Sequence, residues 1–108
     1  MNDTLQKLYD VVLSRKATPQ EGSYTCYLFE KGLDKILKKV GEECAETIIA
    51  AKNGVESDTV GEISDLIYHL MVMMVDQGIP LSAVMEELDR RSLKIGNLKQ
   101  FHTSDHES

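Results

Sequence analysis

The sequence is poor in the residues that build β-structure, zinc sites and disulfide scaffolds. Its 108 residues include no tryptophan, 6% aromatic residues, 2 prolines and 7 glycines. This argues against a β-sandwich or barrel, because such folds need many turns and β-branched or aromatic strands. The 2 cysteines, Cys26 and Cys44, lie far apart and form no CxxC pair. We therefore expect neither a zinc site nor a disulfide, and we expect a reducing cytoplasmic environment.

Positive charge and long apolar runs are also scarce. Twelve Lys and Arg residues stand against 18 Asp and Glu residues, which gives a net charge of −6, whereas coating nucleic acid requires a basic surface. The N-terminal stretch lacks the apolar core of a signal peptide, and no apolar run is long enough to cross a membrane. We predict a cytoplasmic protein that binds neither nucleic acid nor a membrane.

Hydrophobic periodicity predicts that the chain is all-α. Apolar residues recur at the i, i+3, i+4 spacing of amphipathic helices, and turn signals such as Asn53–Gly54 separate the helical stretches. Ser23 and Ser57 are placed to cap two of the helices. The expected helices are residues 2–16, a short turn from Ser23 through Phe29, and residues 33–52, 58–76 and 81–95. They form a single domain of residues 1–96, followed by a polar tail of residues 97–108 that we expect to be frayed.

Two of these helices indicate how the chain packs. Helix 33–52 carries one apolar stripe, and helix 58–76 is apolar on nearly every side after Leu66. The remaining helices offer too little surface to cover the second of these, so we expect a helical bundle that is completed by oligomerisation. The stripe on helix 33–52 comprises Leu33, Ile36, Leu37, Val40, Cys44, Thr47, Ile48 and Ala51.

Four carboxylates form two pairs on these helices. Glu43 and Glu46 are three residues apart on one helix, as are Glu62 and Asp65 on the next, so each pair lies on one side of its helix. Glu43 falls at the border of the apolar stripe rather than on the solvent side. A turn at Asn53–Gly54 would join the two helices as an antiparallel hairpin and bring the two pairs to similar heights.

Converging carboxylates repel one another, by roughly 3 kcal/mol per pair at about 5 Å and an effective dielectric of about 20. A hard divalent cation would offset that repulsion, and oxygen ligands without His or Cys favour Mg²⁺ or Mn²⁺ over zinc and copper. A ferritin-like di-iron site is disfavoured because the chain has no Glu-x-x-His, and an EF-hand is excluded because its acidic loop is missing. The alternative is that these acids are solvated surface charge.

Basic residues precede the acids on helix 33–52. Lys35, Lys38 and Lys39 recur at a spacing of three to four residues, and Arg91 lies on the last predicted helix. Beside a metal site these side chains suit a ligand that carries several phosphates, although a solvated helix face is the alternative. His69 is expected either to have a structural role or to support the metal ligands without binding the metal itself.

Two stretches of the sequence resemble the phosphoribosyl-ATP pyrophosphatase family. They are SYTCYLFEKGLDKILKKVGEE at residues 23–43 and EISDLIYHL at residues 62–70, and the likeness extends over nearly the whole chain. The ExxE motif followed by ExxD is shared with the wider MazG-like nucleotide pyrophosphohydrolases, whereas the first stretch is specific to the enzymes of histidine biosynthesis.

The resemblance implies an activity and a set of site residues. The activity is Mg²⁺-dependent hydrolysis of phosphoribosyl-ATP to phosphoribosyl-AMP and pyrophosphate, the second step of histidine biosynthesis, by a MazG-like helical fold assembled as a homodimer or higher homo-oligomer. The implied metal ligands are Glu43, Glu46, Glu62 and Asp65, with Glu42 as a neighbouring acid.

Within this interpretation, either Glu42 or Glu46 would orient or deprotonate the attacking water, and the basic residues Lys35, Lys38, Lys39 and Arg91 would contact phosphates. The cyclohydrolase domain that is fused to this one in many relatives is absent from the sequence, so a separate cyclohydrolase is expected to act on the product. Two alternatives stay open. The first is a MazG-like enzyme that hydrolyses noncanonical nucleoside triphosphates, and the second is a non-catalytic helical interaction module.

Overall fold

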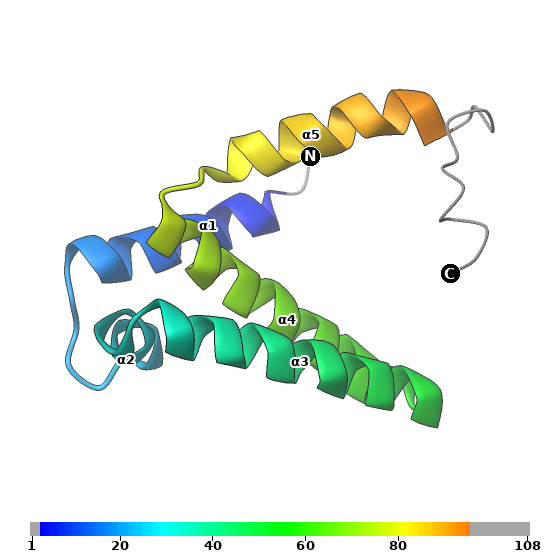
Figure 1. The fold of residues 1–108 in the computed structure, drawn as a ribbon, viewed down its shortest axis with the longest axis horizontal. Helices are drawn as coiled ribbons and strands as arrows, with labels where there is room; N and C mark the ends of the chain where they lie inside the picture. The colour runs from blue at the N-terminus through cyan, green and yellow to red at the C-terminus, as the bar shows by residue number, and fades with distance from the viewer. Residues whose placement is uncertain (1–2, 96–108) are drawn as a thin grey trace.

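A computed structural model describes residues 3–95 of the chain, and all of its regular elements are α-helices (Figure 1). This confirms the predicted all-α class, while the predicted tail, residues 97–108, lies outside the described residues. Within residues 3–95 no single helix is long and apolar enough to cross a membrane, and only the pair Glu56–Gln77 and Leu81–Leu93, bent by 115°, has the length and composition together. The helices are α1 (Thr4–Ala17), α2 (Tyr24–Lys31), α3 (Leu33–Asn53), α4 (Glu56–Gln77) and α5 (Leu81–Ile95).

The helix ends follow the sequence signals with one exception. Ser23 caps α2 as predicted, because its hydroxyl accepts a hydrogen bond of 3.2 Å from the Cys26 amide. Gly54 ends α3 in the left-handed conformation, with φ of 78°, and its amide donates to carbonyls of the last turn. The prediction that Ser57 caps α4 is wrong, because α4 begins at Glu56 and its N-cap, Val55, makes no side-chain cap. Acidic side chains in the first turn support that end of the helix instead.

The two longest helices, α3 and α4, pack as an antiparallel hairpin, α1 and α2 lie at the end of it away from the Gly54 turn, and α5 starts near that end and runs apart from the hairpin (Figure 1). Helix α1 packs on α4, and α2 fills the corner between α1, α3 and α4. The Tyr9 hydroxyl on α1 donates a 2.7 Å hydrogen bond to the Ile79 carbonyl in the turn after α4. This arrangement leaves the Gly54 end of the hairpin without a covering helix from the described part of the chain.

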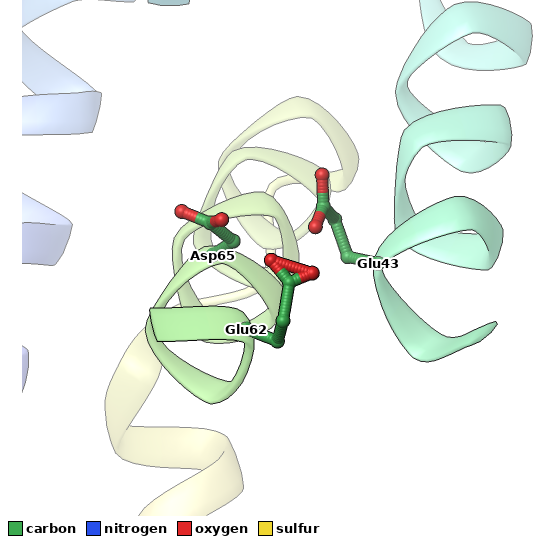
Figure 2. Close-up of side chains that lie close together, drawn as sticks. All are labelled: Glu43, Glu62 and Asp65. Carbon is green, nitrogen blue, oxygen red and sulfur yellow. The ribbon is translucent and has the colours of Figure 1, made fainter. Parts of the chain in front are cut away.

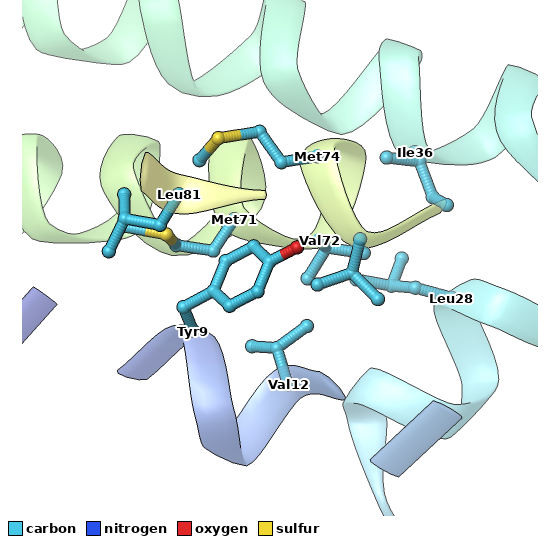
Figure 3. Close-up of a cluster of buried hydrophobic side chains, with 9 residues drawn as sticks. Tyr9, Val12, Leu28, Ile36, Met71, Val72, Met74 and Leu81 are labelled. Atoms are coloured by element: carbon cyan, nitrogen blue, oxygen red, sulfur yellow. The ribbon is translucent and has the colours of Figure 1, made fainter. Parts of the chain in front are cut away.

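A buried hydrophobic cluster sits where α1, α2 and the C-terminal half of α4 meet (Figure 3). Val12, Leu28, Ile36 and Val72 are fully enclosed in it, and burying an aliphatic side chain of this size contributes about 1.5–3 kcal/mol. The cluster consists of Tyr9, Val12, Leu28, Ile36, Met71, Val72, Met74, Val75 and Leu81.

The uncovered apolar surface lies elsewhere than predicted. The side chains of α4 after Leu66 are largely buried within the chain, because α1 and α2 cover them. On α3, the predicted stripe buries Ile36 only, and Leu37, Cys44, Ile48 and Ala51 are exposed. Four apolar residues near the Gly54 end of the hairpin have exposed side chains: Ile48 (70%), Ile49 (59%), Val60 (54%) and Ile63 (42%). We call them the hairpin apolar residues. The face of α3 that packs on α4 is marked instead by Ile36, Glu43 and Ala50, each seven residues from the next.

Candidate functional site

The predicted acid pairs meet across the hairpin. Glu43 of α3 and Glu62 and Asp65 of α4 each offer one carboxylate oxygen, and these oxygens lie within 4.8 Å of one another (Figure 2). The Thr47 hydroxyl fixes the register of the two helices beside them, since it lies 2.7 Å from the Glu43 carbonyl and 3.3 Å from the Glu62 carbonyl. We call Glu43, Glu46, Glu62 and Asp65 the acid cluster.

Glu43 is the most unusual member of the acid cluster because it is only 6% exposed. Its Oε1 lies 3.7 Å from the ammonium of Lys39, whereas its buried Oε2 has no hydrogen-bond partner among the described residues. An unpartnered carboxylate oxygen is costly to bury. The oxygen-only donor set and this free oxygen fit a hard divalent cation such as Mg²⁺.

Two members of the acid cluster, Glu43 and Glu62, hold their protons more tightly than isolated carboxyl groups do. Burial is the main cause that raises the pKa of Glu43, and a hydrogen bond to Glu46 and the nearby charges add to it. A hydrogen bond to Glu46 is the main cause that raises the pKa of Glu62 to about 7. Glu46 therefore raises the pKa of both neighbours, although its oxygens are not among the three that converge. A divalent cation would replace the shared protons by neutralising the same charges.

Lys39 connects the acid cluster with the basic residues of α3. Its ammonium lies 3.2 Å from Oε1 of Glu42, and this contact is the main cause that lowers the pKa of Glu42. Lys38 and Lys35 also lower the pKa of Glu42 by their charge, but of these three lysines, all within the described part of the chain, only Lys39 forms an ion pair with the acid cluster, through Glu43. Lys35 in addition lies over the Tyr27 ring, 6.0 Å from its centroid.

The structure places Arg91 differently from the lysines. Arg91 forms an ion pair of 2.7 Å with Glu87 on its own helix, and α5 lies away from α3 (Figure 1). A phosphate contact by Arg91 stays a prediction that the geometry of one chain does not support.

An open groove borders the acid cluster on the side of the Gly54 turn. It has a volume of about 580 Å³ and is lined by residues of both hairpin helices, among them Glu46, Asn53, Asp58 and Glu62. This volume is in the range of small-molecule sites, so the groove leaves room for a ligand beside the carboxylates.

Sequence reasoning missed two residues at the site. Thr47 was assigned to the apolar stripe, and Tyr24 received no role, yet the Tyr24 hydroxyl lies 3.0 Å from Nε2 of His69. Both contacts join different helices, and helical periodicity carries no information about them. His69 is buried and hydrogen-bonded, in line with the structural role expected for it.

Comparison with known proteins defines the class and then the family of the chain. A helical hairpin that gathers the ExxE and ExxD acids fits the MazG-like class that these motifs predict. The family model described as phosphoribosyl-ATP pyrophosphohydrolase matches residues 5–92. The chain belongs to this family, which confirms the resemblance seen in the sequence.

Curated relatives agree with the family match. The chain is 52% identical over 97 residues to a phosphoribosyl-ATP pyrophosphatase of Clostridium novyi (strain NT), covering 90% of this chain and 88% of that protein. It is 54% identical over 95 residues to one of Listeria monocytogenes serotype 4b, covering 88% and 91%. It is 65% identical over 83 residues to the histidine biosynthesis bifunctional protein HisIE of Thermoanaerobacter pseudethanolicus, covering 77% of this chain and 38% of that protein.

Proposed function

We propose that this chain hydrolyses phosphoribosyl-ATP to phosphoribosyl-AMP and pyrophosphate, the second step of histidine biosynthesis, in the cytoplasm and with Mg²⁺ as its metal. The observation that carries the proposal is the convergence of Glu43, Glu62 and Asp65 inside the region that matches the family. The names of the relatives support the same substrate. A separate cyclohydrolase would take the product, and the bifunctional relative HisIE is consistent with such a link.

The acid cluster would hold Mg²⁺, or Mn²⁺, through Glu43, Glu46, Glu62 and Asp65. When bound, the metal would neutralise phosphate charge and lower the pKa of a bound water. The net reaction adds water across the bond between the first two phosphates of the triphosphate and releases pyrophosphate. Little covalent chemistry is required of the protein, because pyrophosphate is a stable leaving group once its charge is offset.

The remaining roles follow from the contacts of each side chain. Glu42 bonds to Lys39 and has a lowered pKa, which makes it a weaker proton acceptor. We therefore propose that Glu46, which hydrogen-bonds to Glu62 at the acid cluster, accepts the proton of the attacking water. Lys35, Lys38 and Lys39 would bind the phosphates from the α3 side of the site.

A direct assay tests the proposed reaction. We expect the purified chain with Mg²⁺ to release pyrophosphate from phosphoribosyl-ATP at least about a hundredfold faster, in kcat/KM, than from any deoxynucleoside triphosphate of a panel. Equal or faster turnover of the panel would favour the alternative enzyme that acts on noncanonical nucleotides. An absence of turnover with every substrate would favour the interaction module.

We also propose that the chain assembles as a homodimer or higher homo-oligomer through the hairpin apolar residues. Four large apolar side chains exposed at one end of a hairpin are typical of a surface that another protein covers. Sedimentation equilibrium at micromolar concentration should give a mass of at least twice the 12.1 kDa of one chain.

Substitution of one hairpin residue localises the contact. Ile48→Glu should weaken self-association at least about tenfold, because it places a charge in a surface that assembly would bury. Val11→Glu, at an exposed apolar position on α1, is the matched control and should leave the mass unchanged. A compact monomer for the wild-type chain would contradict this proposal without touching the proposed reaction.

A further inference from the structure

Two hydrogen bonds hold the His69 ring beside the acid cluster, one within α4 and one from α2. Nδ1 of His69 lies 2.7 Å from the backbone carbonyl of Asp65, and a carbonyl can only accept, so this nitrogen carries the proton. In the neutral ring Nε2 is then an acceptor, and the Tyr24 hydroxyl at 3.0 Å donates to it. The direction of both bonds is set by the Asp65 carbonyl.

The donating hydroxyl is suited to this role. Burial is the main cause that raises the pKa of Tyr24, so the hydroxyl keeps its proton at neutral pH. The Tyr24 ring meets the His69 ring edge-on at 5.8 Å, and His69 itself is 5% exposed. Tyr24 is 45% exposed, so the contact is buried on the His69 side and reaches solvent on the Tyr24 side.

A second contact between the same helices offers a natural comparison. The hydroxyls of Thr25 and Tyr68 form a hydrogen bond with each other, so two consecutive residues of α2 bind two consecutive residues of α4. The surroundings of the two contacts differ. The Tyr24 contact continues through His69 to the carbonyl of Asp65, a member of the acid cluster, whereas the other contact joins the side chains of Thr25 and Tyr68 to each other.

The Tyr24–His69 contact thus leads to the part of α4 that carries Asp65. Tyr24 from α2 bonds to Nε2 of His69, and Nδ1 of His69 bonds to the Asp65 carbonyl. The carboxylate of Asp65 converges with those of Glu62 and the buried Glu43 (Figure 2). The position of this turn of α4 therefore affects how the three carboxylates meet.

We propose that Tyr24 and His69 are positioning residues whose hydrogen bond, through the bond of His69 to the Asp65 carbonyl, holds the turn of α4 that carries Asp65. The Asp65 carboxylate is thereby held where it meets those of Glu43 and Glu62, so that the site binds a divalent cation tightly. The inference rests on the proposed function insofar as Asp65 is taken to be a metal ligand. Groups that orient metal ligands from outside typically change metal affinity by 10- to 100-fold when they are lost.

Mg²⁺ affinity without substrate tests this inference. Calorimetric titration of the full chain with MgCl₂ should show about tenfold weaker binding for Tyr24→Phe, which keeps the ring and removes the donor. Thr25→Val removes the parallel contact between α2 and α4 and is the matched control. Its Mg²⁺ affinity should stay within about threefold of the wild type, while its urea midpoint in EDTA falls by an amount similar to that of Tyr24→Phe.

Two variants of His69 show which of its ring nitrogens affects the affinity for Mg²⁺. The amide of Gln at position 69 reaches the place of Nε2 and can accept from Tyr24, whereas the amide of Asn reaches only the place of Nδ1. His69→Gln should therefore retain more Mg²⁺ affinity than His69→Asn, and Tyr24→Phe added to His69→Asn should cause no further loss.

The outcomes distinguish failure of the positioning role from failure of the proposed reaction. The inference is overturned if Tyr24→Phe binds Mg²⁺ within threefold of the wild type, or if Thr25→Val loses as much affinity as Tyr24→Phe does. Failure of the wild-type chain to release pyrophosphate, with these affinities as expected, would reject the proposed reaction and leave the positioning role intact.

Discussion

Replacing Glu62 by Gln should produce a metal-free protein that resists urea better than the wild type and yet releases almost no pyrophosphate. The amide keeps the size and polarity of the side chain, but it removes one charge from a group that Glu43, Glu46 and Asp65 surround. Loss of that repulsion raises the urea midpoint in EDTA. A neutral amide is a poor ligand for Mg²⁺, so we expect kcat/KM to fall about a hundredfold or more.

The gain in stability has a defined pH dependence. The pKa of Glu62 is raised from 4.5 to about 7 in the folded chain, so between these values the folded state binds more protons than the unfolded state. Wild-type stability therefore falls as the pH rises through this window. Gln cannot titrate, so the difference between the two urea midpoints should widen from pH 5 to pH 7 and be largest near pH 8.

Glu43→Gln and Glu56→Gln complete the experiment. Glu43→Gln should lose activity like Glu62→Gln, since both acids belong to the same cluster. Glu56 lies in the first turn of α4, where a carboxylate favours the helix, so Glu56→Gln should lower the urea midpoint slightly and spare activity. Glu62→Gln and Glu43→Gln variants that are less stable but active would leave the metal centre without support.

Mg²⁺ should stabilise the wild-type fold by roughly 2.7 kcal/mol when its concentration is 100 times its dissociation constant, provided that it binds the folded state alone. Urea unfolding in EDTA and in MgCl₂, at matched ionic strength, measures this difference. The effect should grow between pH 6 and pH 8, because the metal must displace protons from Glu62 and Glu43, whose pKa values are both raised.

Two variants test whether the stabilisation by Mg²⁺ depends on the acid cluster. Glu62→Gln should show only a small part of the stabilisation, whereas Lys52→Gln, at an exposed position on α3 outside the acid cluster, should show all of it. Superimposable wild-type unfolding curves with and without Mg²⁺ would exclude a metal centre formed by the acid cluster.

The hairpin and its acids could be predicted because they depend on neighbours in the sequence. The i, i+3 spacing places Glu62 and Asp65 on one side of α4, and the glycine at position 54 supplies the left-handed turn that folds α4 back on α3. These are local relationships, and a helical period of 3.6 residues expresses them directly.

Other features could not be predicted because periodicity shows which face is apolar but not what covers it. The stripe on α3 predicted burial of Ile48, which is exposed, and gave no reason to bury the charged side chain of Glu43 completely. α4 was expected to lack cover after Leu66, but α1 covers it through contacts such as that of Tyr9 with the turn at Ile79. Contacts between distant helices decide these cases, and they leave no regular spacing in the sequence.

The nearness of the acids along the chain has a consequence for the order of folding. Glu43 and Asp65 belong to consecutive helices joined by one short turn, so their pairing closes a short loop, which costs little chain entropy and occurs early. The core that joins Val12 of α1 to Val72 of α4 links more distant segments and closes later. Repulsion among the carboxylates therefore opposes an early step, and a cation or proton that neutralises it speeds folding more than it slows unfolding.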